Sequence, residues 1–421
     1  MLKKEKADKK VKEVSKSLSA LAWRRLKRNV PAMFGAIVIL FACVIAILGA
    51  TIRPDQTKNA ANGLPPISTK SPGFTVKHLM VHKNDTILQS SFFGMMFLGG
   101  RENAYRYIPI TDFEFRGAEI IVKEYVGDDE NAKFRATSIP VMLADVLYPL
   151  HLNNRYQEDG QGNVTFYDIN NNKITRSIED MQKEVAEKNI VEQTYWLGTD
   201  RNGRDLLSRL MAGTIISLAV GLISVLISLI IGISLGAIAG YFRGWIDDVV
   251  MWLINVVWSI PTLLLVIAVT IALGKGFWQV FVAVGLTMWV EVARIVRGQV
   301  LSIREKEFVE AGRALGFRSP RIIFRHVLPN VMGPVIVISA ANFASAILIE
   351  SGLSFLGVGV QPPMPSWGSM IAQHKDYITT DMAYLAVLPG IATVVMVLAF
   401  MLVGNGLRDA LDTKAVDDIR A

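Results

Sequence analysis

The sequence contains little cysteine and little charge. Of its 421 residues only Cys43 is a cysteine, so no intrachain disulfide can form and cysteine usage does not indicate a redox compartment. Charged residues make up 19% of the chain and hydrophobic residues 51%. No GxxxxGK[ST] phosphate-binding loop is present, which excludes a P-loop ATPase. This composition indicates a protein that lies largely in a lipid bilayer.

Long apolar runs, of which the fourth also contains Glu291 and Arg294, predict six membrane-spanning helices, because runs of more than about 18 apolar residues are typical of such helices. The runs fall at residues 30–52, 210–242, 249–273, 276–296, 327–349 and 382–407. The first run is too long for a signal-peptide core, so we expect it to be retained. The central parts of the runs contain almost no carboxylates, which argues against an ion-coupled secondary transporter.

Basic residues gather beside these spans. Residues 1–29 hold eleven Lys or Arg, and residues 294–325 hold eight. Because cytoplasmic loops are enriched in Lys and Arg, both segments are expected in the cytoplasm, as is the tail 410–421. Leu18, Leu21, Ala22 and Leu26 recur at helical spacing and predict an amphipathic helix on an anionic leaflet. A disordered basic tail is an equally good interpretation of residues 1–16.

Residues 53–195 form a polar insertion between the first two spans, for which we predict an α+β extracytoplasmic domain. Ala118–Val126 alternates as a strand does, and residues 163–168 and 173–176 flank an Asn-rich turn typical of a hairpin. Ser177 is placed to cap a helix over Ile178–Asn189. Phe92–Gly100 is apolar but too short to cross a bilayer, and is expected in the domain core or at the interface.

Two histidines in the insertion, His78 and His82, are four residues apart and could share a helix face near Asp85. Such a face would suit a metal ion, but no third or fourth ligand lies at a familiar spacing. Two surface histidines are the simpler interpretation. No metal site is predicted.

Residues 305–330 are too charged to lie in lipid and predict a helix, a turn and a second helix. Gly316 lies where a helix C-cap is expected, after a helix that ends near Leu315. Ser319 and Pro320 supply an N-cap and a first helical residue for the next helix. Pro329 marks the restart of the chain into the next apolar run.

This segment resembles the EAA loop of bacterial ABC importer permeases. Glu310-Ala311-Gly312 is followed by Gly316 and, after nine intervening residues, by His326-Val327-Leu328-Pro329. Gly312 and His326 replace the Ala and Ile that are usual in the family, and both replacements resemble its peptide-transporter branch. The resemblance implies a cytoplasmic coupling helix that docks in a cleft on an ATPase. The residues that match this motif are Glu310, Ala311, Gly312, Arg313, Gly316, His326, Leu328 and Pro329. An ordinary amphipathic connector is the alternative.

Leu197–Asp205 resembles the GTDxxGRD signature that precedes the second span in peptide permeases of this family. The matching residues are Gly198, Thr199, Asp200, Gly203, Arg204 and Asp205. From the residues alone, Thr199 or Asp200 could cap a short helix that places Arg204 and Asp205 at the outer interface.

Two residues are candidates for the transport pathway. Pro261 interrupts the third predicted span, where freed carbonyls could face a water-filled path; a static kink is the alternative. Glu350 is an acid at or just inside the outer interface; a re-entrant structural loop over Glu350–Gly357 is the alternative. Glu291 and Arg294, three residues apart in the fourth span, are expected to pair.

Gly232, Gly236 and Gly240 recur at four-residue intervals in the second predicted span. Small residues at this spacing let a neighbouring helix approach closely inside lipid. They are therefore expected to be packing residues and not a phosphate-binding loop.

The resemblance, which covers residues 196–409, implies an all-α polytopic membrane protein with the six-helix type I ABC importer permease fold. The protein resembles the C-type permease subunit of an oligopeptide or dipeptide importer of the bacterial inner membrane, with both termini cytoplasmic. Implied partners are a homologous B-type permease, two ATPases, an extracytoplasmic peptide-binding protein and membrane lipid, but no nucleic acid. The partner ATPases would use ATP and Mg, and this chain would hold no cofactor and no catalytic residue.

Other functions stay open. The substrate could be nickel, a peptide antibiotic or glutathione in place of a peptide. A secondary transporter and a membrane-anchored receptor, with residues 53–192 as its sensing domain, are further alternatives. A receptor of this kind would not explain five further spans.

Overall fold

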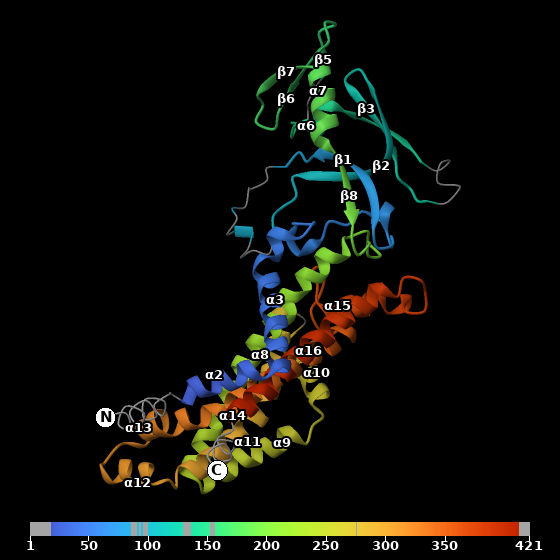
Figure 1. Ribbon diagram of the computed structural model, residues 1–421. Helices are drawn as coiled ribbons and strands as arrows, with labels where there is room; N and C mark the ends of the chain where they lie inside the picture. Colours follow the sequence, from blue (N-terminus) through green and yellow to red (C-terminus); the bar gives the residue numbers. More distant parts are fainter. Residues whose placement is uncertain are drawn as a thin grey trace, which may run out of the picture. The chain divides into compact units, whose positions relative to one another are not determined.

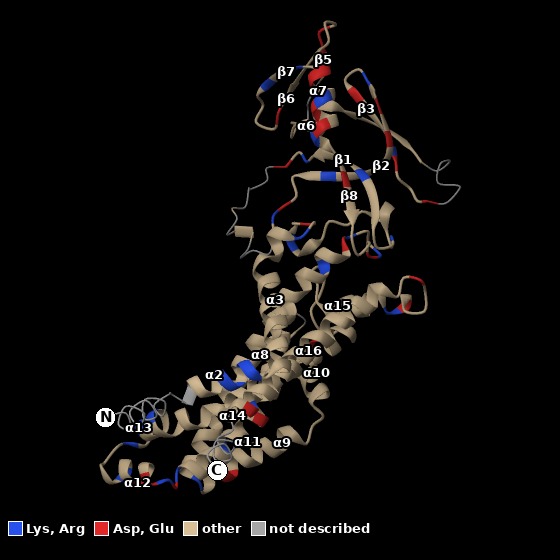
Figure 2. Ribbon diagram, in the orientation of Figure 1, with Lys and Arg blue, Asp and Glu red and all other residues tan. Residues whose placement is uncertain are grey.

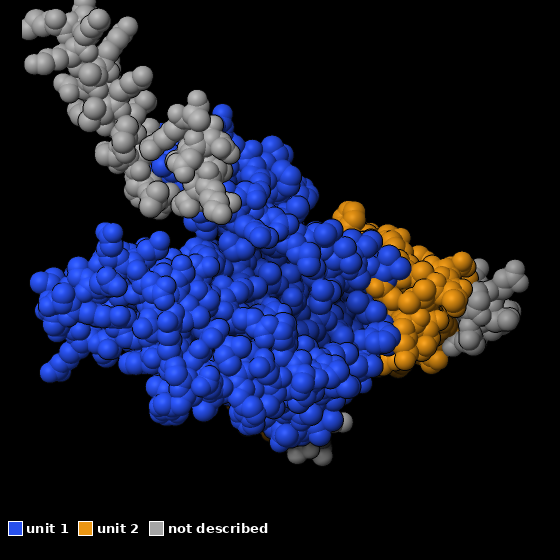
Figure 3. Space-filling view, turned by 90° about the horizontal axis from the view of Figure 1, so that it is seen from below, with its two compact units in different colours: residues 1–44, 214–373, 387–421 blue, residues 45–213, 374–386 orange. Residues whose placement is uncertain are grey.

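A computed structural model of the protein describes the chain except residues 1–17, 86–90, 92–93, 96–99, 129–135, 152–155, 275 and 412–421. The predictions for the basic tail, for Phe92–Gly100 and for the C-terminal tail therefore lie largely outside the described residues. The chain forms two compact units, which Figure 3 colours separately. Unit 1 holds residues 1–44, 214–373 and 387–421, and unit 2 holds residues 45–213 and 374–386.

Long apolar helices dominate unit 1 (Figure 1). Among the described residues, five helical runs are long and apolar enough to cross a membrane, or six if the bent pair α9–α10 is one span. The five are α3 (Val30–Ile52), α8 (Leu206–Phe242), α11 (Phe277–Ile303), the run Ser319–Phe355 and α16 (Tyr384–Leu411). Shorter helices are α2 (Leu18–Arg28), α12 (Glu307–Ala314) and α15 (Trp367–His374). In Figure 2 charged residues mark α2 and α12, whereas α3 is uncharged.

The third predicted span is broken at Pro261. It consists of α9 (Trp245–Trp258) and α10 (Thr262–Leu273), whose axes differ by 94°. Proline has no N–H to donate and disfavours helical geometry at the residue before it. Pro261 accordingly occupies the N-cap position of α10. The predicted interruption is therefore confirmed, and it takes the form of a sharp turn between two helices.

The restart predicted at Pro329 coincides with the first turn of α14, which begins at Leu328. Helical structure runs without a break from Ser319 to Phe355 through α13 (Ser319–Ile322), the π-helical turn η4 (Ile323–Val327) and α14 (Leu328–Phe355). A proline is tolerated in the first turn of a helix, and the π turn before it shifts the hydrogen-bond register. The Asn330 side-chain amide donates to the His326 carbonyl at 2.7 Å, which satisfies one main-chain acceptor at this junction.

The three regularly spaced glycines of α8 confirm their predicted packing role. A Cβ at Gly236 would lie 2.5 Å from the Ala293 carbonyl oxygen of α11. A Cβ at Gly232 would lie 2.5 Å from the Cβ atom of Val292. A Cβ at Gly240 would lie 2.8 Å from the Arg297 carbonyl oxygen. Real Cβ atoms do not come this close to other heavy atoms. The closest approach of α8 to α11 therefore requires glycine.

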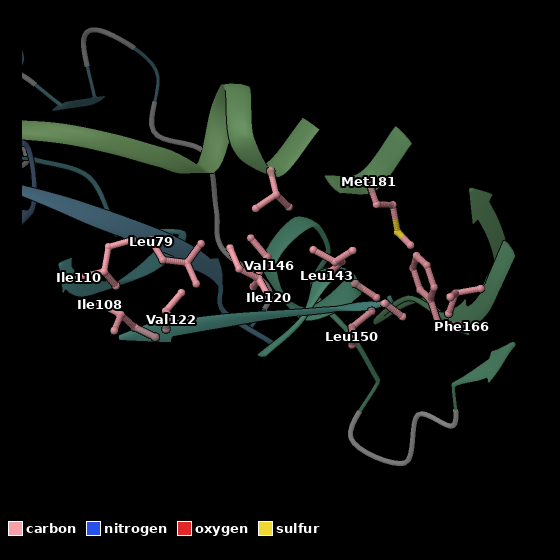
Figure 4. Packing of buried hydrophobic residues seen from close by; sticks show 14 residues of the cluster. Leu79, Ile108, Ile110, Ile120, Val122, Leu143, Val146, Leu150, Phe166 and Met181 are labelled. Atoms are coloured by element: carbon pink, nitrogen blue, oxygen red, sulfur yellow. The ribbon is translucent and has the colours of Figure 1, made fainter. Parts of the chain in front are cut away.

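An antiparallel five-stranded sheet lies in unit 2, with strand order β4-β3-β2-β1-β8. Its strands are β1 (Phe74–His82), β2 (Tyr105–Arg116), β3 (Glu119–Glu124), β4 (Ser138–Met142) and β8 (Ile190–Tyr195). The short helix α6 (Leu143–Leu147) packs on this sheet. Figure 4 shows Leu143 and Val146 of α6 beside Ile120 of β3, and all three are fully buried. This cluster is the hydrophobic core of the unit.

A three-stranded sheet completes unit 2, with β5 (Gln157–Glu158), β6 (Asn163–Tyr167) and β7 (Lys173–Ser177). The β6–β7 pair confirms the predicted hairpin, and β3 confirms the strand predicted over Ala118–Val126. The predicted helix is α7 (Ile178–Glu184) continued by the π turn η3 (Val185–Asn189). Ser177 holds the N-cap position of α7, but its side chain makes no capping hydrogen bond.

The two histidines lie on strand β1 and not on a helix, so the shared helix face that a metal could use does not form. Four residues along a strand span roughly 13 Å, too far for two ligands of one ion. His78 is fully buried, and its Nε2 lies 3.2 Å from the Tyr195 hydroxyl. His82 Nδ1 lies 2.9 Å from the Lys83 carbonyl oxygen. No group of three potential ligands suitable for a metal occurs among the described residues.

Candidate functional site

The turn at Gly316 has the geometry of a Schellman motif. Helix α12 ends at Ala314, and Gly316 adopts a left-handed φ of +76°. The Gly316 N–H donates to the Arg313 carbonyl, and the Phe317 N–H donates to the Gly312 carbonyl. These two bonds satisfy carbonyls that would otherwise be unpaired at the helix end. The predicted C-cap glycine is confirmed, whereas the N-cap of the next helix is Arg318 and not Ser319.

The residues of the EAA-like motif divide into exposed and packed positions. Exposed positions are Glu310, Ala311, Arg313, Gly316 and Pro329; Gly312 is buried, and His326 and Leu328 are half-buried. The guanidinium of Arg313 lies 5.3 Å from the Tyr241 ring, a cation–π distance. The His326 ring stacks on Phe317 with centroids 6.0 Å apart. The motif thus supplies both an outward surface and contacts that hold its shape.

Three large apolar side chains of this segment are exposed. Leu315 and Phe324 are each 72% exposed, and Phe308 is 46% exposed. Glu310 and Arg313 lie exposed on α12 among them. Exposed apolar groups edged by charge are typical of surfaces that bind another protein. We define Phe308, Glu310, Arg313, Leu315 and Phe324 as the hairpin surface.

The hairpin is anchored to the long helices of unit 1. Val309 of α12 and Ile322 of α13 are buried in a cluster with Val300 of α11 and Tyr241 of α8. The Arg304 guanidinium donates to the Tyr241 carbonyl at 2.5 Å. The hairpin is therefore packed on the helix ends, and a displacement of the hairpin must displace them as well.

The GTDxxGRD-like motif forms a buried turn in unit 2 and not the short capped helix that was predicted. Asp200 is fully buried, and its Oδ1 accepts from the backbone N–H groups of Asn202 and Arg204. Its Oδ2 accepts from Arg204 Nε at 2.6 Å. Thr199 Oγ1 donates to the Ile67 carbonyl. The carboxylate thus closes a loop, which is a common use of Asp.

The glycines of this motif are required by backbone geometry. Gly198 and Gly203 have φ of +78° and +70°. A Cβ on Gly198 would collide with the Lys70 carbonyl, and one on Gly203 with the Leu64 carbonyl. The motif therefore fastens residues 64–70 to the start of α8, and this was not visible from local sequence because the partners are about 130 residues away.

The cap of α8 is Asp205. Asp205 is 3% exposed, and its Oδ2 accepts from the Ser208 N–H at 2.8 Å and from the Ser208 hydroxyl. Burial raises the pKa of this carboxyl. The prediction that Thr199 or Asp200 would cap a helix here is wrong, because Asp200 is used within the turn.

Sequence reasoning missed three polar residues around this motif. Arg53 is 1% exposed, and its guanidinium donates to the carbonyls of Asp55 and Thr57. The Asp55 N–H donates to Ser208 Oγ at 2.9 Å. Arg209 is also buried, with Nε 3.6 Å from Asp200 Oδ2. An Arg next to an apolar run is read as a topology signal, and only tertiary structure shows that Arg53 is buried.

Glu350 lies in α14 and is fully buried. Its Oε1 accepts from the Ser354 hydroxyl at 2.7 Å. Ser354 Oγ in turn accepts from the Val360 N–H at 3.1 Å and lies 3.3 Å from the hydroxyl of Ser366. These bonds hold the loop after α14 and favour the structural interpretation of Glu350. The other pathway candidate, Pro261, is exposed at the break between α9 and α10.

Comparison with known proteins identifies relatives for most of the helical part. The family described as "binding-protein-dependent transport system inner membrane component" matches residues 232–416, and "N-terminal TM domain of oligopeptide transport permease C" matches residues 17–66. The chain is 42% identical over 220 residues to the glutathione transport system permease protein GsiD of Pectobacterium atrosepticum. This match covers 52% of this chain and 73% of the relative.

The chain belongs to the binding-protein-dependent transport system inner membrane component family. It is also 40% identical to the dipeptide transport system permease protein DppC of Alkalihalophilus pseudofirmus and 38% identical to the oligopeptide transport system permease protein OppC of Bacillus subtilis. Each match covers 52% of this chain and 72% of the relative. The recognition as a C-type permease subunit is confirmed. Neither family description covers residues 67–231.

This permease is a helical, multi-pass inner-membrane transport subunit and is not itself catalytic. Its family implies ATPase and binding-protein partners. The GTDxxGRD-like residues precede α8 in the sequence, and the EAA-like residues follow α11. The two motifs belong to different structural units. One forms an exposed helical hairpin, and the other forms a buried turn.

Proposed function

We propose that this permease is the C-type subunit of an ATP-driven importer that moves oligopeptides or dipeptides across the cytoplasmic membrane. Its partners would be a B-type permease, two ATPases that consume ATP and Mg, and an extracytoplasmic peptide-binding protein. The observation that carries the proposal is the exposed hairpin surface on a helical hairpin that continues directly into a long apolar helix. Both termini of the chain would be cytoplasmic, with residues 53–195 outside the cell.

The hairpin would act as a mechanical lever. The run Ser319–Phe355 is helical over 37 residues, or about 55 Å at the usual rise. An ATPase that grips Glu310 and Arg313 and moves α12 would therefore move the inner end of this helix. Closure of the two ATPases would rock the helix bundle between inward-open and outward-open states. Gly316 holds the turn that links the gripped helix to the membrane helix.

The names of the relatives support a peptide substrate. Relatives that carry the names glutathione, dipeptide and oligopeptide permease all match at 38–42% identity. Glutathione is itself a short peptide, so the three names share one chemistry. Nickel or a peptide antibiotic is the second candidate, since the binding protein usually selects the substrate in such systems.

Uptake into vesicles tests this function. The complex is purified through this chain and reconstituted with the binding protein, and labelled dialanine, pentaalanine and glutathione are offered with and without ATP. We expect ATP-dependent uptake of at least one of them. Uptake that follows an ion gradient and ignores ATP would contradict the importer assignment and favour a secondary transporter.

Two variants test the hairpin. Glu310→Lys reverses a charge on the hairpin surface, and Gly316→Pro forces a φ near −65° where +76° is needed. We expect both to insert in the membrane and to abolish uptake. Gly312→Ala is the matched control, because its Cβ would meet only Phe317 at 3.6 Å and Ile322 at 3.9 Å. Normal uptake with Glu310→Lys would show that this surface does not couple to the ATPase.

A further inference from the structure

An acidic residue, Glu291, lies near the midpoint of helix α11, toward the inner end of the fourth predicted span. Glu291 is roughly 20 Å from either end of α11 at 1.5 Å per residue. A carboxylate within a membrane-spanning segment is costly to place and is kept where it faces a cavity or a charged ligand. Glu291 is exposed on the surface of this chain, whereas Val292 and Ala293 beside it are fully buried.

Glu291 is free of the partner that the sequence predicted. Its expected partner Arg294 instead places its guanidinium 3.5 Å from the centroid of the Trp258 ring. No ion pair within 4 Å joins Glu291 to Arg294 or to any other residue that the structure describes. The carboxylate therefore remains available to a cation that is not part of this chain.

A cavity of about 320 Å³ lies in front of Glu291 at the break between α9 and α10. Its wall is mixed: Glu291, Thr287, Thr262 and Ser345 are polar, and Trp258, Ile260, Leu265, Met288 and Leu348 are apolar. Among the described residues that line this cavity, Glu291 alone is charged. The volume falls within the range of small-ligand sites, which begins at about 300 Å³.

The sharp turn at Pro261 explains why space exists here. Non-helical backbone at membrane depth is stable only where it is buried in protein or lines a cavity. Trp258, Ile260 and Thr262, which flank the turn, all line this cavity. A second cavity of about 220 Å³ shares Trp258 and Glu291 and is also lined by Arg294.

The geometry points to Glu291 as the residue that receives the α-ammonium group of a peptide during its passage through the membrane. This inference rests on the proposed function and adds a substrate-binding residue to it. A carboxylate beside an aromatic ring suits a primary ammonium, which accepts both ionic and cation–π contacts. Among the described residues that line the two cavities, Glu291 alone is acidic. Arg294, which lines only the second cavity, is basic.

The test uses Glu291→Gln in the intact complex, reconstituted in phosphatidylethanolamine–phosphatidylglycerol vesicles. The probe is whichever of labelled dialanine, pentaalanine or glutathione the unchanged complex imports with ATP. A hydrogen bond to a charged group contributes about 1.5–3 kcal/mol, so we expect uptake to fall at least tenfold. Glu291→Asp keeps the charge and should retain most of the uptake.

The double variant Glu291→Gln/Arg294→Gln separates binding from charge balance. If Glu291 only neutralises Arg294, removal of both charges restores uptake, and the inference is overturned. If Glu291 binds the ammonium group, the double variant stays as low as the single one.

Co-purification with the partner subunits gives a second readout. A loss of the second permease from the Glu291→Gln complex would show that Glu291 pairs with that subunit, and would also overturn the inference. Unchanged uptake by an assembled Glu291→Gln complex would overturn the role assigned to Glu291 and would leave the proposed function standing. Absence of ATP-dependent uptake by the unchanged complex would overturn the proposed function, and this inference with it.

Discussion

Substitution of Gly236 by alanine should force α8 and α11 apart. A Cβ at this position would lie 2.5 Å from the Ala293 carbonyl oxygen and 2.9 Å from Val296 Cβ. Ordinary contact begins at 3.4 Å, so the helices must separate by about 0.9 Å. Because the nearest atom belongs to the backbone, rotation of a neighbouring side chain cannot relieve the clash.

The expected cost of Gly236→Ala follows from the behaviour of overpacked interfaces. Inserting a methyl group into a closely packed contact typically destabilises a protein by about 1–3 kcal/mol. For a body of this size, that corresponds to a decrease in Tm of roughly 2–12 °C. Helices in lipid are held together mainly by close packing, so little else compensates for the lost contact.

Gly298→Ala is the matched control, because this glycine lies on α11 itself and a Cβ there would meet nothing within 4 Å. Alanine is favoured over glycine in a helix interior by up to about 1 kcal/mol, so the control should be neutral or stabilising. Thermal unfolding of both variants in detergent, followed by tryptophan fluorescence, provides the comparison. Equal Tm values for Gly236→Ala and Gly298→Ala would refute the close approach of α8 and α11.

Two further predictions concern unit 2. Burial lowers the pKa of His78 to about 4, below its ordinary value of 6.5, so the unfolded chain binds a proton more readily. The free energy of unfolding of unit 2 should therefore decrease as the pH falls from 6.5 to 4. In His78→Phe, hydrogen exchange of the β1 amides should depend less on pH than in the unchanged protein. An equal pH dependence in both proteins would contradict this prediction. Asp205→Ala removes the cap from the Ser208 N–H and should cost about 1–2 kcal/mol. Hydrogen exchange of the first amides of α8 should be faster in this variant. Asp159→Ala, a substitution at an exposed position, is the control.

Local signals were reliable where the backbone alone decides the outcome. Gly316 was identified as a helix end because only glycine adopts a positive φ without strain, and the observed φ is +76°. Pro261 was identified as an interruption because proline cannot donate a helical hydrogen bond. The size of the turn, 94°, was not predictable, since it depends on how α10 packs against α11.

Predictions failed where a distant partner competes for the same side chain. Thr199 or Asp200 was expected to cap a helix, but the Thr199 hydroxyl donates to the distant Ile67 carbonyl and Asp200 closes the turn with Arg204. His78 was expected at the surface, but pairing with β2 and β8 places it on a buried strand. Glu291 was expected to pair with Arg294, but the arginine stacks on Trp258 from another helix.

The sequence by itself determined that the protein is a membrane protein, and it predicts which hydrophobic runs span the bilayer and that a polar hairpin with the EAA-like motif lies outside lipid. These properties depend on the transfer of side chains between water and lipid, which is a property of each segment alone. Tertiary structure alone decided which carboxylates are paired, buried or free, and where a cavity opens. Those outcomes depend on distances between residues far apart in the chain, because a buried charge is stable only beside a partner that the fold brings to it.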